Sequence, residues 1–278
     1  MARRLGDVEL VSADSMQVYR GMDIGTAKPS PAEQAEIPHH VIDVTDPSDD
    51  FNVARFQEAA AGAIAGIEAR GHRALVVGGT GLYVQAVVDG LAMPGDWPDL
   101  KAELEAEPVE ELHRRLGALD PLAASRIEPG NARRLVRALE VTLGSGRPFS
   151  SFGPGLGAYP ATARFRLAGV WLPRPVLAER IAARYRAQLD AGFLHEVDRL
   201  SEVMSRTARQ ALGYRELLEH LTGGCTLEEA IDAAVRRTRE FARRQRAWFR
   251  RDPRITWLGA AHNPVDLLPS LLGDWSLS

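Results

Sequence analysis

The chain has 278 residues, 45% of them hydrophobic and 26% charged, with a formal net charge of −3 at pH 7. This composition is typical of a soluble globular protein, and no apolar run approaches the ~20 residues of a membrane span. One cysteine, Cys225, excludes an internal disulfide and a cysteine-cluster metal site. Arg3 and Arg4 lead into Asp7 without the apolar core of a secretory signal. We therefore expect a cytoplasmic protein with one large domain, or one domain plus an insertion.

The opening stretch, Asp7 to Pro29, reads D-V-E-L-V-S-A-D-S-M-Q-V-Y-R-G-M-D-I-G-T-A-K-P. Its apolar run, Val8 to Val11, is too short for a helix and predicts a strand buried in a parallel sheet. Asp14 then lies just past the carboxyl end of that strand, where ligands bind in open α/β sheets. Capping of the next turn by Asp14 or Ser15 is an alternative that the local pattern leaves equally open. An irregular, functional loop is expected over Val18 to Pro31.

The next elements are a second strand, a helix and a third strand. Val41 to Val44 predicts a short apolar strand, and Asn52 to Arg70 has apolar residues at helical spacing. Ala74 to Val77 predicts a buried strand that runs into the G-G-T-G turn at Gly78 to Gly81, followed by another helix. Such a turn can aim backbone N–H groups at a phosphate or a nucleobase. By itself, however, G-G-T-G favours a tight turn for close helix–strand packing.

A composition break with two prolines and a glycine occupies Met93 to Pro98. From Asp99 to Ser145 the pattern is helical and contains no strand. Asp120 is followed by proline and begins one short helix, and Asn131 caps the next. The sequence therefore predicts a helical insertion inside an α/β core.

Strand and helix patterns resume after the insertion. The predicted elements are a strand at Phe165 to Leu172, a helix at Pro175 to Asp190, a helix from the Thr226–Glu229 capping box to about Arg251, a strand at Ile255 to Leu258 and a closing helix at Val265 to Leu272. Alternating strands and helices predict an α/β fold with a largely parallel sheet flanked by helices.

Positive charge is concentrated near the end of the chain. Between Val235 and Arg254 there are nine arginines, at positions 236, 237, 239, 243, 244, 246, 250, 251 and 254, against Glu240 and Asp252. Because the whole chain is mildly acidic, this segregation suits a polyanionic partner on one face. For Arg180, Arg184 and Arg186 in the helix of residues 175–190, a solvated face with local ion pairs is the favoured interpretation.

Several longer strings resemble one family in order along the chain. Asp14 to Pro29 resembles the signature of the tRNA dimethylallyltransferases, also called tRNA isopentenyltransferases, of the IPP transferase family. The resemblance continues through G-G-T-G-L-Y (78–83), R-R-L-V-R-A-L-E-V (133–141), Q-A-L-G-Y-R-E (210–216) and R-R-Q-R-A-W-F-R (243–250). It covers nearly the whole chain. It implies a P-loop-NTPase-like catalytic core at 1–93 and 149–278, with a helical insertion domain at 94–148 that contacts the tRNA anticodon arm.

The sequence departs from this family at its start. The family opens with a strand and a phosphate-binding loop of the form G-x-T-x-x-G-K-[ST], and here only Met1 to Gly6 precede the opening strand. These six residues resemble the end of the helix that follows that loop. We therefore expect the first strand and the phosphate loop to be missing, because of a misplaced start or a truncation. A cradle of backbone N–H groups is not replaced by side chains elsewhere, so weak or absent turnover is expected of this form.

The resemblance implies transfer of a dimethylallyl group from dimethylallyl diphosphate to the N6 amine of the adenosine 3′-adjacent to the anticodon. The lone pair of that amine is delocalised, so a carboxylate that takes its proton would raise its reactivity. Asp14 matches the family's proposed general base. Charge at the departing diphosphate requires cations and N–H donors, and the family uses Mg²⁺ and an arginine that aligns with Arg184. Thr80 belongs to a motif that contacts the target nucleotide.

The anticodon stem-loop must also be gripped and its adenosine flipped out of the stack. By resemblance, the residues that bind tRNA are Asp14, Ser15, Met16, Gln17, Thr80, Arg133, Arg134, Leu135, Val136, Arg137, Gln210, Ala211, Leu212, Gly213, Tyr214, Arg215, Arg243, Arg244, Gln245, Arg246, Ala247, Trp248, Phe249 and Arg250. Arginine suits this task because its planar fork pairs with phosphates and stacks on bases. A monomer is expected.

Three other functions fit part of the pattern. An enzyme that prenylates free adenine nucleotides shares the core, but the insertion and the arginine-rich helix favour a large RNA. A small-molecule kinase resembles the core too, yet it has no positive support without a phosphate loop. A non-catalytic tRNA-binding remnant is compatible with the truncation and would bind RNA in a salt-dependent way.

Overall fold

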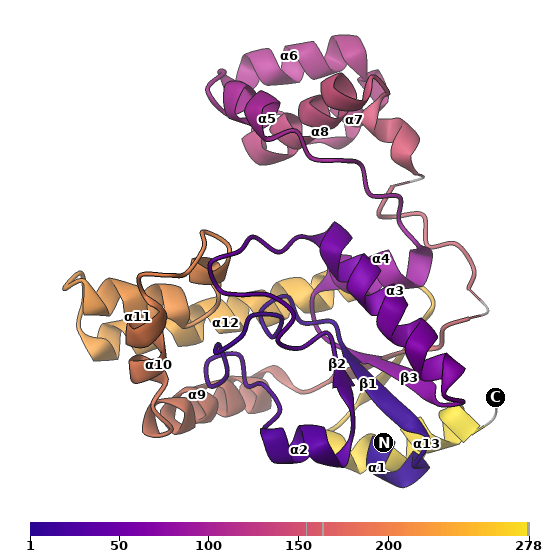
Figure 1. The fold of residues 1–278 in the computed structure, drawn as a ribbon, viewed down its shortest axis with the longest axis vertical. Coiled ribbons are helices and arrows are strands. Elements are labelled where there is room, and N and C mark those ends of the chain that lie inside the picture. Colours follow the sequence, from indigo (N-terminus) through magenta and orange to yellow (C-terminus); the bar gives the residue numbers. More distant parts are fainter. Residues whose placement is uncertain (154, 163, 277–278) are drawn as a thin grey trace. The chain divides into compact units, whose positions relative to one another are not determined.

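The computed structural model describes residues 1–153, 155–162 and 164–276, and they divide into two compact units (Figure 1). The α/β unit combines Met1–Asp89 with the chain from Ala161 onward, and the helical unit is Gly90–Pro160. None of the described helices is long and apolar enough to cross a membrane. The helical unit contains the whole of the insertion predicted at 94–148.

A parallel three-stranded sheet forms the base of the α/β unit. Strand β1 (Val8–Ser12) lies between β2 (His39–His40) and β3 (Arg73–Val77), with Leu10 opposite His39 and Ser12 opposite Val77. The strand predicted at Val8 to Val11 is confirmed, and its valines are buried. The strand predicted at Ala74 to Val77 is also confirmed as β3. The prediction that it is buried is wrong, because Val77 is 52% exposed.

A second parallel sheet pairs β4 (Leu167–Trp171) with β5 (Ile255–Gly259). Both strands were expected from the sequence. Within the described ranges, β4 and β5 form a sheet separate from the β2–β1–β3 sheet. The α/β prediction with parallel strands flanked by helices is therefore confirmed, with two small sheets in place of a continuous one.

The strand predicted at Val41 to Val44 is wrong. Strand β2 ends at His40, and the next residues turn away because Val41 (φ 61°) and Asp43 (φ 55°) adopt left-handed backbone conformations. A β-branched residue in that region is strained, so the surrounding contacts must hold it. Here the N–H groups of Asp43 and Val44 donate to the carbonyls of Gln17 and Val18, at 3.2 and 2.9 Å.

The α/β unit contains nine α-helices among its described residues: α1 (Ala2–Leu5), α2 (Pro31–Glu36), α3 (Val53–Ala69), α4 (Gly81–Asp89), α9 (Arg174–Asp190), α10 (Phe193–Leu200), α11 (Tyr214–Leu221), α12 (Leu227–Phe249) and α13 (Leu268–Ser276). Helix α3 packs on β1 and β3 (Figure 1). Its buried face is Phe56, Ala60, Ile64 and Ile67, as the helical spacing predicts. Helices α9 to α12 pack against one another.

The long helix α12 begins where the sequence predicts. Thr226 Oγ1 accepts from the Glu229 N–H at 3.2 Å, and Glu229 Oε2 accepts from the Thr226 N–H at 2.8 Å. This reciprocal capping box satisfies N–H groups that the first helical turn leaves without partners. Ala230, Ala234 and Thr238 are buried, which fixes the helix against the body of the unit.

The core of the α/β unit is rich in aromatic side chains. Phe56 and Tyr83 stack with ring centroids 4.1 Å apart, and Phe193 meets Tyr214 edge-on at 4.9 Å. Aromatic pairs in these geometries stabilise a core beyond the area that they bury. Val11 belongs to the same buried cluster, so the strand that precedes Asp14 is rooted in this core.

The helical unit consists of α5 (Pro98–Glu105), α6 (Val109–Leu119), α7 (Pro121–Arg126) and α8 (Ala132–Ser145). Its core contains Leu104, Leu112, Leu116, Leu135 and Leu139. Asp120 caps α7 through the Ala123 N–H at 3.0 Å, and Asn131 caps α8 through the Arg134 N–H at 3.2 Å. Both predicted helix starts are confirmed, and no strand is assigned to the described residues of this unit.

Candidate functional site

Asp14 lies two residues beyond the end of β1, at the carboxyl edge of the sheet. Its Oδ1 accepts from the Met16 N–H at 2.8 Å, so the turn-capping interpretation describes its local geometry. Burial raises the pKa of the Asp14 carboxyl, while the N–H groups of Met16 and Gln17 and the charge of Arg184 oppose that shift. Arg184 therefore lies close enough to act on this carboxylate, although it comes from the distant helix α9.

The G-G-T-G turn meets the Asp14 turn directly. Thr80 Oγ1 accepts from the Ser15 N–H at 3.2 Å, and its own hydroxyl lies 3.3 Å from Ser15 Oγ. The Thr80 N–H donates to the Ala13 carbonyl at 3.4 Å. Because β1 and β3 are parallel neighbours, their carboxyl ends bring these two motifs together. Thr80 thus lies against the turn that carries Asp14.

Close packing explains the glycines of this turn. A Cβ at Gly78 would overlap the carbonyl oxygen of Ala13, and a Cβ at Gly79 would overlap the side chain of Gln245. A Cβ at Gly81 would overlap the indole of Trp248. The tight-turn interpretation therefore accounts for all three glycines.

The contacts with Gln245 and Trp248 join the G-G-T-G turn to the R-R-Q-R-A-W-F-R motif of α12. Gln245 Nε2 donates to the Gly79 carbonyl at 2.9 Å, so these two side chains of α12 face the protein. Their predicted contact with tRNA stays a prediction. The packing shows that α12 holds the turn that carries Thr80.

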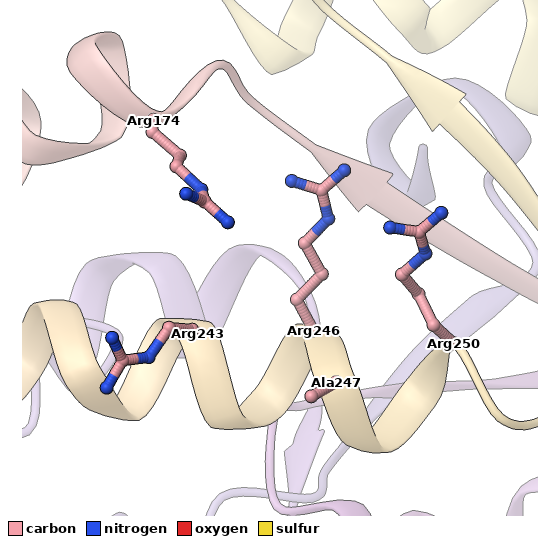
Figure 2. A pocket seen from close by; sticks show the side chains of 5 residues that line it. All are labelled: Arg174, Arg243, Arg246, Ala247 and Arg250. Atoms are coloured by element: carbon pink, nitrogen blue, oxygen red, sulfur yellow. The ribbon is translucent and has the colours of Figure 1, made fainter.

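On the side of α12 opposite Gln245 and Trp248, arginines line an open pocket of about 540 Å³ (Figure 2). The residues around it are Arg174, Arg243, Arg246, Ala247 and Arg250. The three α12 arginines are three and four residues apart, which places them on one side of the helix. Figure 2 shows Arg174 extending from the start of α9 toward the side from which Arg246 and Arg250 project. The guanidinium carbon of Arg246 lies 5.0 Å from the centre of a Trp171 ring.

Some neighbouring arginines have acidic partners, whereas the four around this pocket have none among the described residues. In the described part of the chain, Arg237 pairs with Glu216, Arg244 with Glu240, and Arg254 with Asp89 and Asp252. No such acidic partner within 4 Å is found there for Arg174, Arg243, Arg246 or Arg250. Four uncompensated guanidinium groups around one opening make an anion-binding surface. Sequence reasoning missed Arg174, because only the fold brings the start of α9 to α12.

The Q-A-L-G-Y-R-E segment is mostly internal. Ala211 and Tyr214 are buried, whereas Gln210 and Arg215 are exposed. The Tyr214 hydroxyl donates to Glu196 Oε1 at 2.5 Å. Gln210 and Arg215 thus remain the members with surface to offer an RNA.

The R-R-L-V-R segment lies on α8 in the helical unit, whereas Asp14 belongs to the α/β unit. Arg133 and Arg134 are exposed, and Leu135 and Val136 are part of the helical core. Arg137 pairs with Asp96 at 3.0 Å and Glu140 at 2.9 Å. Of the arginines predicted to bind tRNA in this segment, the first two are available to a partner.

The predicted Mg²⁺ has no complete protein site in the structure. Among the described residues there is no group of three or more His, Cys, Asp or Glu side chains that could hold a metal ion. Asp14 is a carboxylate with neighbouring hydroxyls from Ser15 and Thr80, but those hydroxyls bond to each other. The residues present do not by themselves fit a resident metal.

Comparison with known proteins assigns the family. A model of the IPP transferase family matches residues 17–252, which include the Gln17, Thr80, Arg184 and α12 parts of the site. The chain belongs to the IPP transferase family.

Relatives of known name share this similarity over most of the chain. A tRNA dimethylallyltransferase of Thermobifida fusca is 48% identical over 258 residues, covering 90% of this chain and 80% of that protein. The enzyme of the same name from Streptomyces coelicolor is 46% identical, covering 98% and 88% of the two chains.

Solved structures are similar as well. A tRNA isopentenylpyrophosphate transferase from Bacillus halodurans is 38% identical with a TM-score of 0.68, covering 98% of this chain and 89% of that one. A eukaryotic dimethylallyltransferase acting on tRNA is 28% identical with a TM-score of 0.78, covering 94% and 69%. The fold of this IPP transferase family member is thus shared with enzymes whose names state action on tRNA.

Proposed function

We propose that this chain is a tRNA dimethylallyltransferase that alkylates the N6 amine of the adenosine 3′-adjacent to the anticodon, giving N6-(dimethylallyl)adenosine. The observation that carries the proposal is the packing of the Asp14 turn against the Thr80 turn at the carboxyl edge of the β1–β3 pair, where the charge of Arg184 also acts on the Asp14 carboxyl. The names of relatives at 46 to 48% identity support the same reaction.

Asp14 is the proposed general base. As the bond between N6 and the allylic carbon forms, the bond from that carbon to the diphosphate oxygen breaks, and the N6 proton passes to an Asp14 carboxylate oxygen. Burial raises the pKa of Asp14, which makes its ionised form a stronger proton acceptor than an exposed aspartate. Arg184 supplies positive charge near this point, where it would stabilise the departing diphosphate.

The four-arginine pocket and the exposed Arg133 and Arg134 are the proposed grip on the anticodon stem-loop. Guanidinium groups without acidic partners are free to pair with phosphates. An RNA that replaces counterions at such groups gives binding that weakens steeply with salt. Gln210 and Arg215 offer further polar contacts from the α11 side.

One requirement of the reaction lies partly outside this chain's own residues. Mg²⁺ would arrive with the diphosphate, whose oxygens and water supply most of its ligands. A non-catalytic tRNA-binding remnant is the second candidate, because the arginine pocket would bind phosphates whether or not transfer occurs. A cytoplasmic location and a monomeric state stay predictions.

The experiment measures transfer from labelled dimethylallyl diphosphate, with Mg²⁺, to an anticodon stem-loop and to AMP. We expect product on the stem-loop and none on AMP. Asp14→Asn should lower the rate roughly 100-fold or more, while Asp190→Asn, an exposed aspartate at the end of α9, serves as the matched control. Equal transfer to AMP would favour the nucleotide-prenylating alternative. Salt-dependent stem-loop binding without product would favour the remnant.

A further inference from the structure

The segment from Asp14 to Lys28, here called the Asp14 loop, is held from outside by one buried carboxylate. Glu196 lies on α10 and is 5% exposed. Its Oε2 accepts from the N–H groups of Asp23 and Ile24, at 2.9 and 2.8 Å. Its Oε1 accepts from the Gly25 N–H at 3.0 Å and from the Tyr214 hydroxyl at 2.5 Å. All four donors therefore converge on two oxygens of one side chain.

Packing around this carboxylate leaves the loop little freedom. A Cβ at Gly25 would overlap the rings of Phe193 and Tyr214, so only glycine brings the backbone this close. Gln188 Nε2 donates to the carbonyls of Ile24 and Gly25, at 2.6 and 3.2 Å. Both the N–H and the C=O groups of the loop's far end are thus bound by the α9–α11 layer.

Contacts inside the loop connect that end to Asp14. Gln17 Nε2 donates to the carbonyls of Thr26 and Ala27, each at 3.3 Å, and Gln17 Oε1 accepts from Ser12 Oγ at 2.9 Å. Lys28, with its side chain 2% exposed, donates to the Tyr19 carbonyl at 2.7 Å and pairs with Asp23 and Asp43. Residues on both sides of Asp14 are therefore tied to the part of the loop that Glu196 fixes.

We propose that Glu196, with Tyr214 as its hydrogen-bond donor, is a positioning residue that holds the Asp14 carboxylate in its catalytic orientation. The inference rests on the proposed role of Asp14 as the base. Glu196 acts through the loop, and its N–H contacts orient residues 23–25 without touching the reacting atoms. A negative charge suits this place because its neighbours are all donors. The same contacts explain why Tyr214, in a motif predicted to bind tRNA, is buried.

Glu196→Gln is the informative substitution, because it keeps the shape and replaces one acceptor oxygen by an N–H donor. If Oε2 is replaced, the N–H groups of Asp23 and Ile24 face another donor. If Oε1 is replaced, the Gly25 N–H does so, while the Tyr214 hydroxyl can turn to accept. Tyr214→Phe removes only the hydroxyl. It is the milder variant and remains useful where Glu196→Gln folds poorly. Asp120→Asn is the matched control, since Asp120 is also buried and accepts the N–H groups of Ala123 and Ser150 in the helical unit.

The first measurement follows amide hydrogen exchange and the titration of Asp14 by NMR in the free protein. We expect exchange at residues 23–25 and 16–17 to accelerate about tenfold or more in Glu196→Gln. The pKa of Asp14 should rise further, because looser Met16 and Gln17 N–H groups stabilise its carboxylate less. Arg184 and Tyr83, the other groups that act on Asp14 electrostatically, are unchanged in these variants. Asp120→Asn should alter neither quantity.

The second measurement is steady-state transfer to the anticodon stem-loop. Glu196→Gln should lower kcat roughly 10- to 100-fold with little change in KM for RNA, and Tyr214→Phe should give a smaller loss in the same direction. Unchanged exchange, Asp14 titration and kcat in either folded variant would overturn the inference. If Asp14→Asn itself retains transfer, the proposed base is wrong. Faster exchange in Glu196→Gln beside a fully inactive Asp14→Asn supports the inference.

Discussion

The Asp14 loop and the arginine side of α12, both in the α/β unit, differ in how far their polar groups are bound by the protein itself. In the loop, backbone groups and side chains are bound by Glu196, Gln188, Gln17 and Lys28, so its conformation is set before any substrate arrives. Along α12, the pocket arginines have no acidic partner in the described chain and extend into an open pocket. A proton acceptor requires fixed geometry, whereas a surface that binds phosphates requires positive charge that is not paired with acidic side chains of the protein. This difference is the reason that we assign the proposed proton transfer to the loop and the proposed RNA contacts to α12.

The largest expected effect tests the arginine side. Replacing Arg243, Arg246 and Arg250 together by glutamine should weaken stem-loop binding roughly 100-fold near 0.1 M salt and flatten the salt dependence by about two units of slope. Fluorescence anisotropy across a salt series measures the binding. Folding and the Asp14 titration should stay unchanged. Arg3, Arg20 and Arg164 replaced together form the control, because they are exposed but paired with Glu36, Asp46 and Glu68. An equal loss in the control would remove the contrast.

A middle-sized effect tests the strand beneath the loop. Glu9 on β1 is buried, and it accepts from Arg70, His40 and His72. The hydrogen bond from Arg70, the largest of these influences, lowers the pKa of Glu9 from 4.5 to about 2. Its ionised form therefore stabilises the fold above pH 4.5, and that contribution disappears as the pH falls through 4.5 toward 2.

Glu9→Gln should accordingly lower the free energy of unfolding by about 2 kcal/mol at pH 7, with the difference from the native chain shrinking at acidic pH. Denaturant titrations at several pH values measure it. Glu36→Gln, which breaks the exposed pair with Arg3, should change the free energy of unfolding far less, because solvent screens that pair. A pH-independent difference for Glu9→Gln would contradict the charge-based account. Such a result would separate the stability of β1 from the electrostatics of this cluster.

The smallest effect is a shift in a pH profile. Because the proposed base acts in its ionised form, transfer should rise with pH through the pKa of Asp14, and burial places that limb above the ordinary value of 3.8. Arg184→Gln removes a charge that lowers this pKa, so the limb should move to higher pH. Arg186→Gln, exposed on the same helix, is the control. Single-turnover rates against pH measure the shift, and an unmoved limb would show that Arg184 does not act on Asp14.

Local chemistry made several parts of the protein predictable. The Val8–Val11 run, the Asn131 and Thr226 caps and the helical spacing of residues 52–70 act through neighbours in sequence, and the structure contains each of these elements. The strand predicted at Val41 to Val44 failed because hydrogen bonds to Gln17 and Val18 hold a conformation that local propensity disfavours. Glu196 gave no signal, since its three backbone donors lie more than 170 residues away.

The sequence by itself determined the α/β class, the helical insertion, the family resemblance and the position of Asp14 after the first strand. These follow from periodicity, capping and long motifs, which are properties of neighbouring residues. Only the tertiary structure decided that the G-G-T-G glycines pack on Ala13 and α12, and that Arg174 lines one pocket with three arginines of α12. It also decided that the Tyr214 hydroxyl donates to Glu196. Each of these depends on segments distant in sequence meeting in space, and burial and hydrogen bonding, rather than local preference, select such meetings.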